Sequence, residues 1–108
     1  MQVDVTPTPG KWIVVAPQGR VDGHTAPDFE TACQAQVARG AHWLALDLGG
    51  VPYMSSAGLR VLLATLKAVK AQGGGLALVR PQAGVREVLE ISGFLNIFTV
   101  VGNISDLA

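Results

Sequence analysis

The chain has 108 residues, of which 49% are hydrophobic and 15% are charged, and its eight basic and eight acidic side chains cancel. This length and composition predict one globular domain over residues 1–108 and exclude a disordered chain. Without a basic excess, nucleic acid is not an expected partner. The single cysteine, Cys33, excludes an internal disulfide, and its spacing from Phe29 and Val37 indicates a buried side chain.

The N-terminal sequence has neither the basic segment nor the apolar segment of a signal peptide. No apolar run approaches the roughly 20 residues that a membrane-spanning helix needs. We therefore expect a cytoplasmic protein with no membrane span.

Apolar runs and helical spacing predict five strands alternating with helices. The strands are expected at 3–5, 11–17, 43–48, 76–79 and 96–101, and the helices at 26–39, 56–72, 82–92 and from 103 onward. Thr25 is the expected N-cap of the first helix, and Gly40 is its expected terminator. The strand–helix–strand order over 43–79 predicts parallel strands with a right-handed crossover. The fold class is therefore α/β, with a mixed, mostly parallel sheet of four to five strands and about four helices.

Two loops follow the carboxyl ends of predicted strands, at residues 19–23 and 49–56. Functional residues in open α/β sheets gather outside these ends. We therefore expect Asp22, in the first loop, to lie near the serines of the second loop.

Ser55 and Ser56 stand where the second loop enters the helix expected from Ser56. One serine is enough to cap a helix, and capping is one interpretation of the pair. The other is a regulatory phosphoacceptor, because a helix N-terminus tolerates a phosphate and the small Ala57 and Gly58 leave room for a second protein.

Serine hydrolase chemistry is disfavoured because the Gly-x-Ser-x-Gly pattern is absent. His42 is expected at the opposite end of the sheet from Ser56, and His24 lacks an acid that would orient it.

The glycines at 73–75 lack the lysine and the serine or threonine of a phosphate-binding loop. His24 with its neighbouring aspartates offers too few ligands for a metal. We expect no catalysis, no cofactor and no metal.

Charge is distributed unevenly along the chain, since no acidic residue lies between Asp47 and Glu87. Five basic residues lie in that interval: Arg60, Lys67, Lys70, Arg80 and Arg86. This pattern serves either ordinary solubility and the helix dipole or a polarised face that orients a protein partner.

The element order, the Gly-Arg-Val-Asp run at 19–22 and the run Leu-Asp-Leu-Gly-Gly-Val-Pro-Tyr-Met-Ser-Ser-Ala-Gly-Leu-Arg-Val-Leu-Leu at 46–63 resemble the STAS domain. Within that family the likeness is greatest to bacterial anti-sigma factor antagonists, and it extends over essentially the whole chain.

The resemblance implies a binding module that associates with an anti-sigma factor and frees a sigma factor for transcription. That partner would be a serine kinase of the histidine-kinase-like ATPase type, with ATP as its own substrate. It would phosphorylate Ser56 and so switch binding off, and a serine phosphatase would reverse the change. The expected partner-binding residues are Asp22, Ser55, Ser56, Ala57, Gly58 and Arg60.

This sequence departs from the well-studied members, which carry Asp-Ser-Ser-Gly at this place. Ser55 replaces the aspartate and Ala57 replaces the second serine, so Ser55 remains an alternative phosphoacceptor. An alternative function is a STAS subunit of a lipid or solute transport complex that is never phosphorylated. A small nucleotide sensor is a third.

Overall fold

A computed structural model describes residues 1–107, in which five strands form one sheet whose spatial order follows the chain. The strands are β1 (Gln2–Pro7), β2 (Ile13–Gln18), β3 (Trp43–Asp47), β4 (Gly75–Val79) and β5 (Thr99–Val101). β1 is antiparallel to β2, and each later neighbour is parallel. The expected α/β domain with a mixed, mostly parallel sheet is therefore confirmed.

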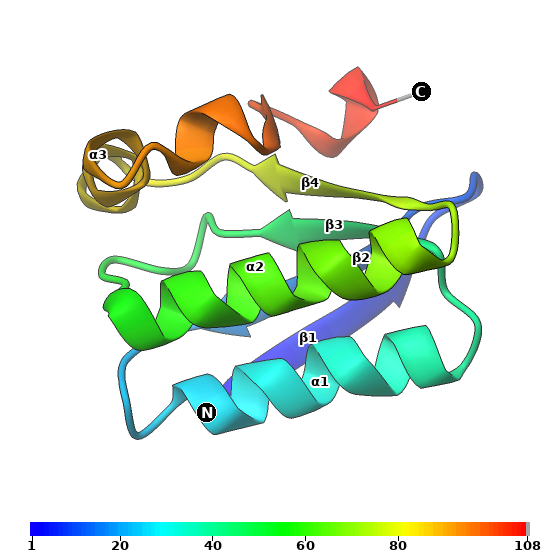
Figure 1. Cartoon of the computed structure of the whole chain (residues 1–108), viewed down its shortest axis with the longest axis horizontal. Coiled ribbons are helices and arrows are strands. Elements are labelled where there is room, and N and C mark those ends of the chain that lie inside the picture. The colour runs from blue at the N-terminus through cyan, green and yellow to red at the C-terminus, as the bar shows by residue number, and fades with distance from the viewer. Residues whose placement is uncertain (108) are drawn as a thin grey trace.

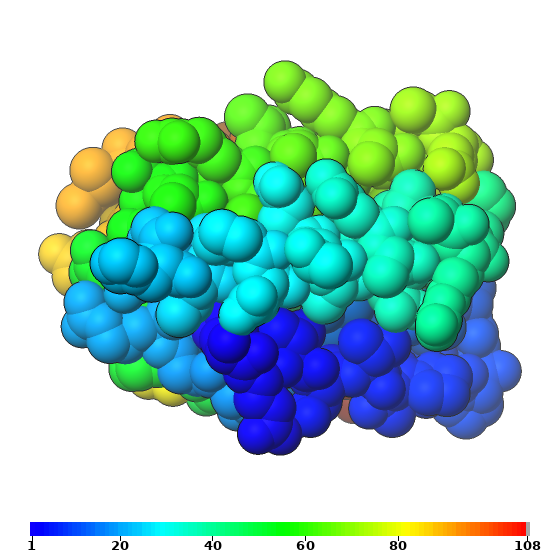
Figure 2. Space-filling model, turned by 90° about the horizontal axis from the view of Figure 1, so that it is seen from below, coloured from blue at the N-terminus to red at the C-terminus, as the bar shows by residue number. Residues whose placement is uncertain are grey.

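Three α-helices connect the parallel strands: α1 (Ala26–Ala38), α2 (Ser56–Ala71) and α3 (Ala83–Ile91). α1 and α2 lie side by side across one face of the sheet (Figure 1). Seen from below, α1 lies between β1 and α2 (Figure 2). The helices α1, α2 and α3 all begin at the edge where β2, β3 and β4 end (Figure 1).

The expected fourth helix is wrong, because residues 103–107 form only the 3-10 turn η2 (Ile104–Asp106). A carboxylate oxygen of Asp106 accepts a hydrogen bond from the Asn103 N–H at 3.1 Å, and Leu107 then returns to an extended conformation. The Asn103 side chain in turn accepts a hydrogen bond from the Asp106 N–H. These two hydrogen bonds close a single turn, and within residues 103–107 the helix goes no further. Similarly, β5 begins later than expected because Phe94–Asn96 form the 3-10 turn η1.

The core lies between the sheet and the helices α1 and α2, and α3 adds the buried Val85 and Leu89 to it. The largest fully buried side chains include Leu44, Leu46 and Leu78 from the strands, Phe29 from α1 and Leu62 from α2. Burying each of these stabilises the fold by about 1.5–3 kcal/mol.

Cys33 is buried in this core, as its spacing predicted, with 1% of its surface exposed. Burial raises the pKa of its thiol to about 12. The thiol is therefore neutral and behaves as a small apolar side chain.

None of the helices in residues 1–107 is long and apolar enough to cross a lipid bilayer.

An ion pair joins the carboxyl ends of β3 and β4. The Arg80 guanidinium donates to both Asp47 carboxylate oxygens, at 2.8 and 3.1 Å, and the Gly49 N–H donates to the same carboxylate at 2.9 Å. Arg80 adopts a left-handed backbone (φ +42°), and its N–H donates to the Val101 carbonyl at 2.8 Å. The pair therefore braces the loop after β3, which leads to the two serines.

Burial by itself raises the pKa of Asp47, but the hydrogen bonds from Arg80 and from the Gly49 N–H outweigh it. The pKa of this carboxyl therefore lies below its ordinary value. A carboxyl group with a lowered pKa stabilises the fold above its unfolded-state pKa, and the contribution is lost as pH falls through the folded-state pKa.

We expect Asp47→Asn to lower the free energy of unfolding by about 1 kcal/mol near neutral pH, since the partner guanidinium is exposed and screened. The difference from the parent should shrink as the pH falls below about 4, because the parent carboxylate is then protonated. Urea unfolding followed by circular dichroism at several pH values measures it, with the exposed Glu87→Gln as control. A difference that stays constant down to pH 2 would contradict the assigned role.

Candidate functional site at the carboxyl edge of the sheet

The loop after β2 and the loop after β3 are joined by a short parallel bridge between Val21 and Met54. The Val21 N–H donates to the Tyr53 carbonyl at 3.0 Å, and the Ser55 N–H donates to the Val21 carbonyl at 2.8 Å. Val21 and Met54 are buried, with 0% and 1% of their surfaces exposed. The two loops therefore lie together, as parallel strands ending at one edge predict.

Ser55 and Ser56 play different parts at the start of α2. Ser55 is the N-cap, with an extended backbone, and its hydroxyl oxygen accepts a hydrogen bond from the Ala57 N–H at 3.2 Å. Ser56 is the first helical residue and is exposed. Within the described residues no hydrogen bond engages the Ser56 hydroxyl. Ser55 therefore caps the helix, and the Ser56 hydroxyl is not needed for the cap.

The N-terminus of α2 is open to an anion. Its first turn holds no acidic residue, and an α-helix leaves its first N–H groups without intrahelical acceptors. The Ser55 hydroxyl satisfies the Ala57 N–H among them. The remaining N–H groups and the positive end of the helix dipole would stabilise a negative group on Ser56.

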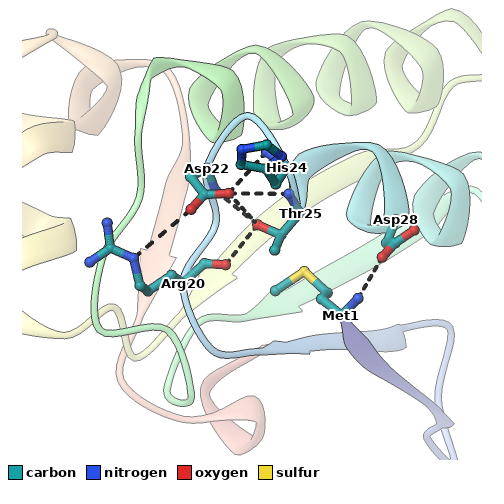
Figure 3. A network of polar contacts seen from close by, with 6 residues as sticks. All are labelled: Met1, Arg20, Asp22, His24, Thr25 and Asp28. Carbon is teal, nitrogen blue, oxygen red and sulfur yellow. Dashed lines mark hydrogen bonds and ion pairs between the residues drawn. The ribbon is translucent and has the colours of Figure 1, made fainter.

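Asp22 caps the turn that leads into α1 (Figure 3). Its Oδ1 accepts hydrogen bonds from the N–H groups of His24 and Thr25, at 3.0 and 3.2 Å. The His24 N–H lowers the pKa of Asp22, burial opposes it and the Thr25 N–H adds to it, so the pKa lies below its ordinary value. Asp22 therefore has a structural role in holding this turn, whether or not it also contacts a partner.

Thr25 occupies the N-cap position of α1 as expected, but its side chain caps no helical N–H. The Thr25 hydroxyl instead donates to the Arg20 carbonyl at 2.7 Å and accepts from the Asp22 N–H at 2.9 Å (Figure 3). The expected side-chain cap is therefore wrong, because the Arg20 carbonyl and the Asp22 N–H engage the hydroxyl. The Ala26 N–H at the start of α1 donates to the Asp22 backbone carbonyl at 2.8 Å.

Arg20 and Tyr53 form an exposed pair that was not among the residues predicted from the sequence. The Arg20 guanidinium lies 4.4 Å from the centre of the Tyr53 ring, and its Nε is 3.9 Å from a carboxylate oxygen of Asp22. Tyr53 keeps 41% of its surface exposed. The signal was present in the sequence, since each residue lies in one of the two loops expected to meet, but neither loop predicts the pairing alone.

A hollow of about 230 Å³ separates the first turns of α1 and α2. Its lining is Gly23, Ala26, Pro27, Glu30, Ala57, Arg60 and Val61. Ala57 is half-buried at this hollow, and Arg60 is exposed. Both are therefore placed where a second protein could reach them.

Gly58 does not lie on the expected contact surface, because it is buried. A Cβ added at Gly58 would lie 2.4 Å from Met54 Cγ and 2.9 Å from Val21 Cγ1. The glycine lets the first turn of α2 pack directly against the Val21–Met54 bridge.

Residues 2–107 match the STAS domain model, so the chain belongs to the STAS domain family. BtrV of Bordetella bronchiseptica, named as an anti-sigma factor antagonist, is 43% identical over 91 residues, which cover 84% of this chain and 78% of BtrV. The chain therefore belongs to the anti-sigma factor antagonist family within the STAS proteins, a family of regulatory binding proteins.

Solved structures agree with this assignment. The crystal structure of an anti-sigma factor antagonist from Mycobacterium paratuberculosis superposes with a TM-score of 0.88 at 28% identity, covering 97% of this chain and 88% of that one. Phosphorylated SpoIIAA of Bacillus superposes with a TM-score of 0.76 at 18% identity, covering 97% and 95%. At that identity SpoIIAA shows the shared fold alone.

We expect Gly58→Ala to lower the free energy of unfolding by about 1–3 kcal/mol, because the added methyl group overpacks Met54 and Val21. The loss should exceed the gain in helix propensity that alanine brings. Chemical denaturation measures it, with Gly84→Ala in α3 as the matched control.

At Gly84 the added Cβ would meet only the Pro52 carbonyl, at an ordinary 3.5 Å. The free energy of unfolding of Gly84→Ala should therefore exceed that of the parent by about 0.5–1 kcal/mol. Equal gains at both positions would show that the approach at Gly58 is not tight.

Proposed function

We propose that this protein is an anti-sigma factor antagonist that binds its anti-sigma factor while Ser56 is unmodified and releases it once Ser56 is phosphorylated. The observation that carries the proposal is the division between the two serines. Ser55 is occupied as the helix cap, whereas Ser56 presents an exposed hydroxyl at a helix N-terminus that has no acid of its own.

The named relatives support both parts of this proposal. BtrV and the solved mycobacterial protein are named as anti-sigma factor antagonists, and SpoIIAA has been solved in unphosphorylated and phosphorylated forms. A protein of this fold therefore accommodates a phosphate. This agrees with an N-terminus of α2 that can accept one without unfolding.

Electrostatics explains how the phosphate would act. A phosphate on Ser56 adds a charge of about −1.5 to −2 at neutral pH. In the free protein the phosphate stays in water near the positive end of α2, so the fold tolerates it. In a complex the same dianion must lose its water, at a cost of several kcal/mol unless it is paired. Phosphorylation therefore opposes docking and leaves the domain folded.

The proposed docking surface consists of Arg20, Asp22, Tyr53, Ser55, Ser56, Ala57 and Arg60. Arg20 and Tyr53 extend the set expected from the sequence, and residues of these two types frequently dominate binding energies. Asp22 shapes this surface through the turn that it caps. Gly58 is left out because it is buried.

The partner we propose is a serine kinase of the histidine-kinase-like ATPase type, opposed by a serine phosphatase. Such a pair would work in the cytoplasm, where sigma factors meet RNA polymerase. The residues described here supply only the hydroxyl, and the kinase supplies ATP and the phosphoryl-transfer machinery.

We expect Ser56→Ala to abolish phosphorylation when the protein is incubated with the cognate anti-sigma factor and ATP. The variant should unfold at the same temperature as the parent, because the Ser56 side chain makes no hydrogen bond within residues 1–107 that stabilises the fold. The matched variant Ser55→Ala should still accept phosphate. It should lose about 1 kcal/mol of stability, because its cap hydrogen bond is removed. Intact-mass spectrometry with fragmentation locates the phosphate, and thermal unfolding measures the stability of each variant.

Phosphate found on Ser55 in the parent protein would overturn the choice of Ser56. A parent protein that binds the anti-sigma factor but is never modified would contradict the phosphorylation switch. It would favour a STAS domain that only binds, as in a transport complex.

A further inference from the structure

We propose that Arg60 holds the phosphate on Ser56 and so acts as an internal counter-charge for the switched-off state. The inference rests on the proposed function, in which Ser56 is the phosphoacceptor. It adds a residue that responds to the modification and a second way in which the phosphate removes the docking surface.

Helix geometry places the two side chains together. Arg60 lies four residues after Ser56 in α2, so both project from the same side of the helix on successive turns. An acid that precedes a base by four residues is the more favourable order. Both side chains are exposed, so the arginine can reach a phosphate without disturbing the core.

Arg60 is also free to respond. No ion pair within the described residues involves Arg60, whereas Arg20 and Arg80 each have an aspartate partner. Glu30 of α1 lines the same hollow as Arg60 without forming an ion pair with it, and it is the carboxylate that would compete with a phosphate for Arg60. A phosphate carries more charge than one carboxylate and offers three acceptor oxygens, so it competes well.

A contact between Arg60 and the phosphate would also weaken binding to the partner. In the unmodified protein Arg60 is an exposed cation on the proposed docking surface. Once Ser56 carries phosphate, Arg60 turns toward it and is no longer available to the partner. Phosphorylation thus adds a charge that must be desolvated and also withdraws a cationic contact.

The test uses the full chain with phosphoserine installed at position 56 during synthesis, so it does not depend on a kinase. Phosphorus NMR at low salt follows the titration of the phosphate in the parent, Arg60→Gln, Arg60→Lys and Lys67→Gln. Arg60→Gln should raise the second pKa of the phosphate by about 0.3 units, the size expected of an exposed helical ion pair. Arg60→Lys should restore most of the parent value, since it keeps the charge.

Lys67→Gln is the matched control, because Lys67 is an exposed cation of the same helix about two turns beyond Arg60. It should leave the titration unchanged. Other charges near the site, those of Arg20, Asp22, His24 and Glu30, are the same in every variant.

Equal pKa values for the parent and Arg60→Gln, or an equal rise in Lys67→Gln, would overturn the proposal. Such a result would not affect the assignment of Ser56 as phosphoacceptor. Conversely, a kinase that ignores Ser56 would overturn the proposed function and leave the measured contact intact.

Discussion

The parallel bridge between Val21 and Met54 continues the pairing of β2 with β3 beyond the ends of both strands. It buries two apolar side chains beneath the loops, and Gly58 lets α2 start directly above them. The position of Ser55 follows, because its N–H donates to the Val21 carbonyl. The cap, the free hydroxyl of Ser56 and the exposed Tyr53 therefore all depend on this one contact.

The side chains that support the fold at this edge differ from the one that we propose to be phosphorylated. Asp22 and Ser55 satisfy backbone N–H groups at the starts of α1 and α2, and the pair of Asp47 with Arg80 braces the loop between β3 and α2. Asp22 and Ser55 also belong to the proposed docking surface, but the Ser56 hydroxyl makes no such hydrogen bond within the described residues. This separation lets a phosphate alter binding while the supports of the fold stay in place.

Patterns that repeat along the chain could be predicted from the sequence. The apolar run of β3 and the helical spacing of leucines in α2 predicted a parallel unit, and parallel strands predicted that Asp22 would approach the serine loop. Contacts between segments far apart could not be predicted in this way. The tight packing at Gly58 and the stacking of Arg20 on Tyr53 both arise where two loops meet. No local pattern encodes them.

In the switch that we propose, a phosphate on Ser56 prevents docking without unfolding the domain. Titration calorimetry with the cognate anti-sigma factor tests it directly, using the unmodified protein and the protein carrying phosphoserine at position 56. We expect measurable binding for the unmodified protein and binding weakened by at least about tenfold, or about 1.4 kcal/mol, for the phosphorylated one. Thermal unfolding should be similar for both. Equal affinities for the two forms would contradict it.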